Sequence, residues 1–310
     1  MFFIALLVIL EIIKVPHAQE KIESLAFSVT RRPLIKNASP ANNNKKSVVA
    51  EEKEIILPLK KNSLAQPYLN AQGGIVIDID TASILFSKNA DQKFALASLT
   101  KIMTAIISIE NYQQNDIITV PESAPTVSGS KINLRTSEQI TVGSLLYGLL
   151  LYSGNDAAHT LASKMGEEKF LEKMNQKAKD LGLNSIFYGD ESGLDQRNSA
   201  TLKEIALLSI YALKNPKFAK IVKTNETTIY SSDGQIAHPL KNTNRLLRDF
   251  PGTFGVKTGF TNEAGHCLIA AAQRGNAKIL SVVVDSPGDQ FIESKKILDW
   301  TFLNYAWYKL

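Results

Sequence analysis

The chain has 310 residues, of which 44% are hydrophobic and 21% are charged. These values are ordinary for a globular protein, so they exclude a fibrous or wholly disordered chain. The single cysteine, Cys267, excludes an internal disulfide and a cysteine-based metal site. The four histidines show no paired spacing of the H-E-x-x-H kind, which argues against a metalloenzyme.

The net charge of +5 is concentrated near the N-terminus. Residues 19–66 carry nine Lys or Arg against five Asp or Glu, whereas residues 67–310 carry 25 against 24. Binding to nucleic acid requires a basic face on the folded part of a protein. Because the larger part of this chain is almost neutral, we expect no nucleic-acid partner.

Two N-terminal segments precede the expected domain. Residues 1–18 are predicted to be a signal peptide or an N-terminal anchor, because Phe2 to Leu10 form an apolar run too short to span a bilayer. Residues 19–66 are polar and basic, which predicts a disordered linker. We therefore expect an exported protein, in the periplasm or on the outer face of the cytoplasmic membrane, with membrane association through the N-terminus.

The first elements of the expected domain, residues 67–310, are strands. Residues 74–80 alternate and are rich in β-branched side chains, which is typical of a strand. Residues 84–86 begin the returning strand of a hairpin. From Ser98 onward the apolar residues recur at helical spacing, which predicts a largely buried helix.

Helices follow, and strands return near the C-terminus. Further helices are expected at 141–151, 155–164, 167–181 and 201–213. Strands are expected at 255–259, 267–272 and 279–284, and a last helix contains Ile297, Leu298, Trp300, Phe302, Leu303 and Tyr305. Strands at both ends with helices between predict an α+β fold, in which both chain ends build one sheet and the middle forms a helical lobe. A cleft is expected where the lobe meets the sheet.

The first chemical motif is an S-x-x-K sequence at residues 98–101. Residues three apart on a helix share a face, so Lys101 can reach the Ser98 hydroxyl. A buried lysine has a lowered pKa, and its neutral amine can take the proton of a serine nucleophile. A second S-x-x-K occurs at residues 128–131, but no apolar helix follows it. Ser98 is therefore the favoured nucleophile.

The second motif, S-x-N, comprises Ser153 and Asn155 between two predicted helices. A second hydroxyl could pass a proton to a leaving amine, and an amide could hold a substrate backbone. Helix capping is the alternative explanation, since Ser and Asn are favoured just before a helix. Residues 87–89 also match the pattern, so the motif alone has little weight.

The third motif is Lys257, Thr258 and Gly259, which form the only K-T-G sequence in the chain. On a strand edge, these residues offer a cation, a hydroxyl and a position where another backbone can approach. They suit an extended peptide that ends in a carboxylate. The alternative is a surface strand that ends in a turn. His266 and Cys267 follow, and we interpret both as packing residues.

The three motifs in this order are the signature of penicillin-binding proteins and class A β-lactamases. Residues 97–105, 153–158 and 255–265 closely resemble the serine D-alanyl-D-alanine carboxypeptidases of peptidase family S11, and residues 242–247 look like the segment before the K-T-G strand in that family. The resemblance covers about residues 67–308. It implies a β-lactamase/DD-peptidase-like fold with three layers, α/β/α, around an antiparallel sheet. It implies no metal or organic cofactor.

The resemblance also implies a catalytic role for each residue that matches a family motif. Ser98 would be acylated by the penultimate D-Ala of a peptidoglycan stem peptide and would release the last D-Ala. Lys101 would accept the proton of Ser98. Ser153 and Lys257 would relay a proton to the leaving amine. β-Lactams would acylate Ser98 in the same way and leave slowly, which makes them the expected inhibitors.

Substrate binding would use further matching residues. Asn155 would bind the substrate backbone, and Lys257 and Thr258 would hold the terminal carboxylate, with Gly259 leaving room for the peptide. The backbone N–H groups of Ser98 and Phe260 would form the oxyanion hole.

Three rival functions remain open from the sequence. A class A-like β-lactamase would need a deacylating base, and Glu191 is the candidate in the loop between the second and third motifs. A peptidoglycan DD-endopeptidase shares the same motif set. A wall-binding protein on an inactive scaffold is disfavoured because the motif residues are present.

Overall fold

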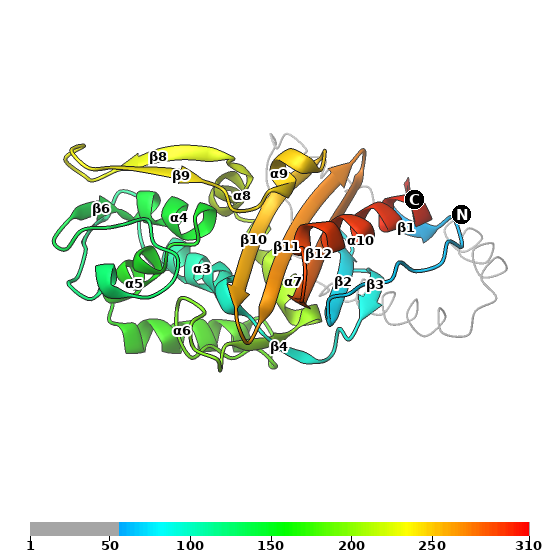
Figure 1. The fold of residues 1–310 in the computed structure, drawn as a ribbon, viewed down its shortest axis with the longest axis horizontal. Coiled ribbons are helices and arrows are strands. Elements are labelled where there is room, and N and C mark those ends of the chain that lie inside the picture. Colours follow the sequence, from blue (N-terminus) through cyan, green and yellow to red (C-terminus); the bar gives the residue numbers. More distant parts are fainter. Residues whose placement is uncertain (1–55, 310) are drawn as a thin grey trace, which may run out of the picture. The chain divides into compact units, whose positions relative to one another are not determined.

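A computed structural model describes residues 56–309 (Figure 1). The expected signal peptide or anchor, residues 1–18, lies outside the described residues, as do residues 19–55 of the expected linker. All of the described residues belong to one compact unit, Lys53–Leu310.

A five-stranded antiparallel sheet forms the centre of the described part, with the strand order β10-β11-β12-β2-β3. Its strands are β2 (Gly73–Asp78), β3 (Ile84–Lys88), β10 (Thr253–Thr261), β11 (Gly265–Arg274) and β12 (Ala277–Ser286). The two ends of the domain meet where β2 pairs with β12, with Ile75 opposite Val282. The prediction that both chain ends build one sheet is therefore confirmed.

Helices cover both faces of this sheet. On one face lies α10 (Gln290–Asn304), whose buried Leu298 and Trp300 belong to a cluster with Phe86 of β3 and Leu268 of β11. The other face contacts α7 (Leu202–Leu213) and α8 (Pro216–Lys223). These three layers confirm the predicted α+β fold.

A helical lobe lies beside the sheet, at the left of Figure 1. Its helices are α3 (Lys101–Asn111), α4 (Val142–Leu151), α5 (Asn155–Ser163) and α6 (Glu167–Asp180). Thr141 shows why α4 begins where it does, because its hydroxyl accepts a hydrogen bond from the Ser144 N–H. The predicted helices therefore match the observed ones to within a residue or two at most ends.

Short elements that the sequence did not predict complete the domain. Three antiparallel pairs join β4 (Lys93–Ala95) with β7 (Ser199–Thr201), β5 (Ile117–Thr119) with β6 (Gln139–Thr141), and β8 (Glu226–Tyr230) with β9 (Ala237–Lys241). The helices that were not predicted are η2 (Ala124–Thr126), α9 (Leu246–Asp249) and α8, whereas η1 (Ala97–Thr100) forms the start of the helix predicted from Ser98. Strands of three to five residues carry too few side chains for a period to stand out in the sequence.

The folded part begins earlier than the residue 67 expected from the sequence. Strand β1 (Ile56–Lys60) lies in the segment expected to be linker and pairs antiparallel with β13 (Tyr305–Lys309). The last helix accordingly ends at Asn304, and Tyr305, which was expected in that helix, is in β13. The expectation of a linker up to residue 66 is thus wrong for residues 56–60, because their partner strand lies at the opposite end of the chain.

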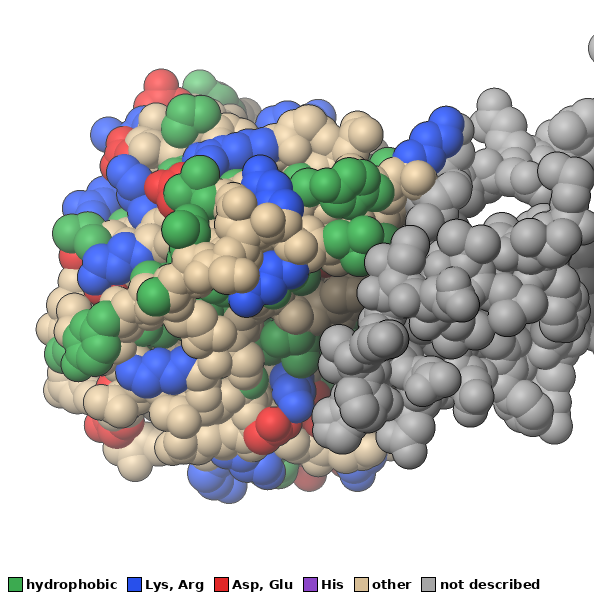
Figure 2. Space-filling view, turned by 90° about the vertical axis from the view of Figure 1, so that its right-hand side faces the viewer, with side chains coloured by type: hydrophobic (Ala, Val, Ile, Leu, Met, Phe, Trp, Pro, Cys, Tyr) green, Lys and Arg blue, Asp and Glu red, His purple; other side chains and the backbone are tan. Residues whose placement is uncertain are grey.

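Figure 2 shows the described surface from the side at the right of Figure 1. On this face, Lys and Arg side chains are scattered among apolar and uncharged ones and do not gather in one patch. Within residues 56–309, no helix combines the length and apolar character needed to cross a membrane.

Trp300 provides a test of the α10 layer. Its side chain is 7% exposed, packs against the rings of Phe86 and Tyr305, and donates a hydrogen bond to the Ala65 carbonyl at 2.8 Å. We expect Trp300→Ala to lower the free energy of unfolding by about 3–5 kcal/mol, the cost of emptying a large buried site. Leu303→Ala, on the same helix but 55% exposed, should change it by less than about 1 kcal/mol. Urea unfolding followed by far-UV circular dichroism measures both, and equal losses would contradict the buried position of Trp300.

Candidate active site

Ser98 and Lys101 meet at the start of helix α3. Ser98 lies in the short helix η1, and Lys101 is the first residue of α3. The distance between Lys101 Nζ and Ser98 Oγ is 3.0 Å. Ser98 is partly exposed, whereas Lys101 is fully buried. A substrate can therefore reach the hydroxyl while the amine is shielded from water.

The Lys101 amine contacts two further oxygen atoms. It donates to Asn155 Oδ1 at 2.6 Å and to the Ser192 carbonyl at 2.5 Å. Burial lowers the pKa of Lys101 from 10.5 to about 7, against the opposing charges of Asp190, Glu191 and Asp156. A substantial share of the amine is therefore neutral near pH 7 and able to accept a proton.

A second serine–lysine pair is formed by Ser153 and Lys257. The Lys257 amine donates to Ser153 Oγ at 2.9 Å and to the Thr258 carbonyl at 2.9 Å. Lys257 is 1% exposed, and burial together with the charge of Lys101 holds its pKa well below the usual range. Ser153 has a positive φ of 67°, a backbone conformation that non-glycine residues rarely adopt. Such strain is typical of functional sites.

The K-T-G motif lies on β10, which is the outer strand of the sheet. A Cβ at Gly259 would lie 3.2 Å from the backbone nitrogen of Ser98, so β10 passes close to the nucleophile turn. Thr258 Oγ1 is 2.7 Å from Thr243 Oγ1. Phe260 is 55% exposed, and its ring stacks on His266 with 4.5 Å between the ring centres.

The second S-x-x-K, residues 128–131, has a different place in the structure. It forms an irregular loop rather than a helix, and the Lys131 amine donates to the Pro125 carbonyl. The loop carbonyls of Ser128 and Ser130 accept hydrogen bonds from the side chain and the backbone N–H of Asn155, both at 2.7 Å. This loop therefore positions the second motif and presents no serine–lysine pair of its own.

The loop at residues 189–198 borders the nucleophile from the other side. Gly193 has a φ of +92°, and a Cβ there would lie 1.8 Å from the Ala97 carbonyl, so only glycine fits against this turn. Asp190 organises the loop by accepting hydrogen bonds from the backbone of Gly193 and Leu194. Glu191 directs its carboxylate to His159, with 3.3 Å between Oε1 and Nδ1.

The structure brings the motif residues predicted from the sequence into one site. Four of the groups that complete it were not predicted: the Ser192 carbonyl, the Asp190 carboxylate, and the hydroxyls of Thr104 and Thr243. The segment at 242–247, which contains Thr243, resembles the family, but it has no period or spacing that reveals which atom faces the site.

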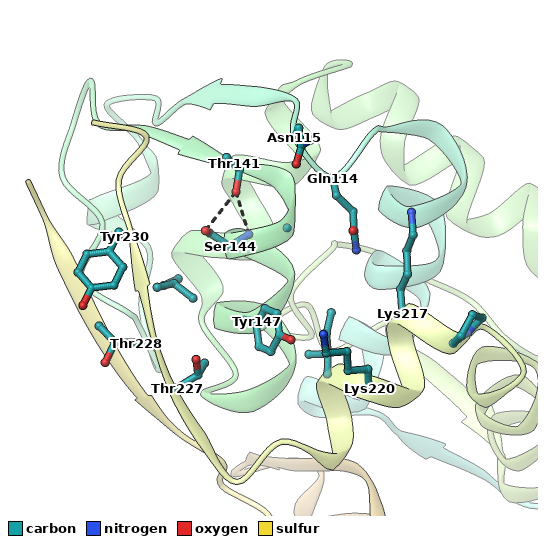
Figure 3. Close-up of a pocket in the computed structure, with 14 residues that line it drawn as sticks. Gln114, Asn115, Thr141, Ser144, Tyr147, Lys217, Lys220, Thr227, Thr228 and Tyr230 are labelled. Atoms are coloured by element: carbon teal, nitrogen blue, oxygen red, sulfur yellow. Dashed lines mark hydrogen bonds between the residues drawn. The ribbon is translucent and has the colours of Figure 1, made fainter. Parts of the chain in front are cut away.

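A pocket of about 700 Å³ lies elsewhere, between α4, α8 and β8 (Figure 3). Its labelled residues include Gln114, Tyr147, Lys217, Lys220 and Tyr230. None of the motif residues lines it. The chemistry described here therefore belongs to the Ser98 cluster and not to this hollow.

The described residues offer neither a group of metal ligands nor a reactive thiol. Among residues 56–309, no three His, Cys, Asp or Glu side chains are grouped in a way that could hold a metal ion. The Cys267 thiol is buried, and burial raises its pKa to about 12. A thiol with so high a pKa is a poor nucleophile, and Cys267 is part of the core.

Comparison with known proteins identifies the family. The family model described as D-alanyl-D-alanine carboxypeptidase, peptidase S11, matches residues 60–288. The chain belongs to this family. It is 34% identical over 250 residues to the D-alanyl-D-alanine carboxypeptidase DacF of Bacillus subtilis. The aligned region covers 77% of this chain and 64% of that relative.

Two further S11 relatives differ in the activity that their names give. The D-alanyl-D-alanine carboxypeptidase of Streptomyces strain K15 is 32% identical and covers 77% of this chain and 90% of its own. The crystal structure of the K15 DD-transpeptidase superposes on this structure with a TM-score of 0.73 at 31% identity. The superposed region covers 77% of this chain and all of the K15 chain. The D-alanyl-D-alanine endopeptidase of Escherichia coli is 29% identical and covers 76% of this chain and 78% of its own.

Proposed function

We propose that this chain is a serine D-alanyl-D-alanine carboxypeptidase that removes the terminal D-alanine from peptidoglycan stem peptides. The observation that carries the proposal is the buried Lys101 amine, 3.0 Å from the partly exposed Ser98 hydroxyl, beside a second serine–lysine pair. Membership of the S11 family supports the same activity. No step requires a metal or an organic cofactor.

Acylation begins at Ser98. The neutral Lys101 amine takes the hydroxyl proton while Ser98 Oγ bonds to the carbonyl carbon of the penultimate D-Ala. The carbonyl oxygen then carries a negative charge, which the backbone N–H groups of Ser98 and Phe260 stabilise. This role suits Phe260 because β10 passes close to the nucleophile turn.

Expulsion of the last D-Ala needs a proton on the leaving nitrogen. Ser153 donates it as the C–N bond breaks, and Ser153 recovers a proton from Lys257, whose amine lies 2.9 Å away. Water then attacks the ester at Ser98 and releases the shortened peptide. Before this step, Lys101 has given its proton to solvent and Lys257 has regained one from solvent, so the neutral Lys101 amine serves as the base for the attacking water and then returns that proton to Ser98 Oγ.

The outer strand β10 binds the peptide. An extended substrate lies along this free edge, where main-chain hydrogen bonds supply part of the affinity. The Thr258 hydroxyl and the Lys257 amine bind the terminal carboxylate, and Asn155 binds the substrate backbone. Thr243 orients Thr258 through the 2.7 Å contact between their hydroxyls.

The proposed location follows from the substrate. Peptidoglycan stem peptides lie outside the cytoplasmic membrane, so the enzyme acts in the periplasm or on the outer face of that membrane. The apolar run in residues 1–18 supports export and membrane association through the N-terminus. β-Lactams, which mimic the D-Ala-D-Ala end, are the expected inhibitors.

The first prediction identifies the nucleophile. Incubation with labelled penicillin should add one penicilloyl group to Ser98, and Ser98→Ala should abolish it because, among residues 56–309, Ser98 has the one hydroxyl that is hydrogen-bonded to Lys101. The matched control is Ser128→Ala, which changes the serine of the exposed second S-x-x-K and should leave labelling unchanged. Peptide mass spectrometry measures the adduct. Labelling that persists in Ser98→Ala, or that is lost in Ser128→Ala, would refute the assignment.

A second prediction concerns the charge of Lys101. Because only the neutral amine accepts a proton and the pKa of Lys101 is about 7, acylation by penicillin should rise with pH through about 7 and level off above it. Lys101→Arg should lower acylation by about 100-fold or more at every pH, since a guanidinium does not act as a base. Lys131→Arg, in the second S-x-x-K, is the control and should retain the wild-type profile. A normal acylation rate for Lys101→Arg at pH 8 would exclude Lys101 as the base.

A third prediction separates the carboxypeptidase from its rivals. The Glu191 carboxylate pairs with His159, so we expect no role for it as the base of deacylation. At pH 8.5, where Lys101 is mostly neutral, the penicilloyl group should leave Ser98 slowly and the shortened peptide should leave it rapidly. Glu191→Gln should change both rates by less than about threefold. Single-turnover deacylation measures these rates.

The opposite outcomes are specific for each rival. Fast penicillin turnover that falls about 100-fold in Glu191→Gln, the scale of a lost general base, would indicate a β-lactamase. A crosslinked muropeptide dimer tests the endopeptidase activity named in one relative. Cleavage of the dimer faster than release of D-Ala would indicate an endopeptidase.

A further inference from the structure

His159 joins three segments around the proposed active site. It lies four residues after Asn155 on α5, so both side chains project from the same face of that helix. Its Nδ1 is 3.3 Å from Glu191 Oε1, and its Nε2 is 2.7 Å from Ser123 Oγ and 3.4 Å from Glu167 Oε1. The His159 and Glu191 side chains are only 12% and 16% exposed. This contact is therefore partly shielded from water.

Glu191 also connects this contact to the catalytic lysine. Its backbone carbonyl accepts a hydrogen bond from Thr104 on α3 at 2.5 Å. The carbonyl of the next residue, Ser192, accepts the hydrogen bond from Lys101, also at 2.5 Å. A displacement of Glu191 would therefore move an oxygen atom that binds the Lys101 amine.

We propose that His159 is a positioning residue for the acylation described above: its contact with Glu191 holds the loop at 190–193 against α3 and balances the negative charge of Glu191. The inference rests on the proposed function, because the step it regulates is proton transfer from Ser98 to Lys101. His159 lies outside the three motifs singled out in the sequence, and no hydrogen bond joins it to Ser98 or Lys101.

The charges around the pair give the direction of the effect. The negative charges of Asp190, Glu191 and Asp156 favour the protonated form of Lys101, and burial opposes them. A protonated His159 next to Glu191 cancels part of the effect of that negative charge. The Lys101 amine then loses its proton more easily. Loss of the imidazole should therefore raise the pKa of Lys101, whereas loss of the carboxylate should lower it.

His159 itself is expected to carry the required charge. The hydrogen bond with Glu191 raises the pKa of His159 above 6.5, burial opposes this, and the charges of Glu167 and Glu191 add to it. A group whose pKa is raised by folding is protonated below that raised value and loses its charge as the pH climbs through it. The contact is therefore strongest below the raised pKa of His159 and weakens at higher pH.

The test compares the pH dependence of penicillin acylation in four variants. The apparent pKa of the acylation rate should rise by about 0.5–1 unit in His159→Gln and fall by a similar amount in Glu191→Gln. The double variant should behave like Glu191→Gln alone, because no carboxylate remains to be balanced. Glu167→Gln is the matched control. It removes the carboxylate at the other ring nitrogen, which is not part of the loop, and should shift the profile by less than about 0.2 unit.

A second readout does not depend on activity. In the ¹H–¹⁵N spectrum of the histidine rings, assigned with His159→Gln, the pKa of His159 should fall toward 6.5 in Glu191→Gln and remain raised in Ser128→Ala. If His159→Gln does not fold, His159→Asn takes its place both for the assignment of the ring signal and for the acylation profile. If the wild-type protein formed no penicillin adduct, the proposed function would fail while the ring titration would still test the pair.

Three results would overturn the inference. The first is an unchanged acylation profile in His159→Gln. The second is a shift caused by His159→Gln that persists in the Glu191→Gln background, since the effect would then not pass through Glu191. The third is a His159 titration that is the same in wild type and in Glu191→Gln.

Discussion

The burial of the Lys101 amine is the constraint on which the rest of the site depends. Removal from water disfavours the ammonium form and lowers the pKa of this lysine to about 7. A buried amine without partners would be costly, and three oxygen acceptors within 3.0 Å offset that cost. Each acceptor belongs to a different segment: the turn of Ser98, the start of α5 at Asn155, and the loop at Ser192. The fold must therefore bring three distant parts of the chain to one nitrogen atom.

The central sheet provides the fourth part, the strand that carries Lys257. Strand β10 reaches the nucleophile because it pairs with β11, while β2 and β3 connect the sheet to the segment that leads into η1. Substitution of Gly259 would place a side chain against the Ser98 backbone, and substitution of Gly193 would place one against Ala97. Two glycines, on opposite sides of the nucleophile turn, thus set how closely β10 and the 189–198 loop approach it.

The sequence predicts those features that a short local pattern can carry. The helix after Ser98 and strand β2 each have a clear period, and the motifs indicate the chemistry of Ser98 and Lys257. The contribution of Ser192 could not be predicted, because it acts through its carbonyl and any residue type supplies one. Strand β1 was missed for a different reason: its pairing with β13 joins the two ends of the domain, and no local signal reports a partner so distant.

The two buried lysines also constrain each other. The charge of Lys101 is one of the two causes that lower the pKa of Lys257, so a proton on either amine disfavours a proton on the other. When Lys101 takes the proton of Ser98, Lys257 is therefore driven to give up its own, and its contact with Ser153 leads that proton toward the leaving nitrogen. In the proposed reaction, the uptake of one proton thus promotes the delivery of the other. A lysine on the surface at either position would lose this coupling. Water weakens the interaction between two charges, whereas the interaction stays strong inside a buried site.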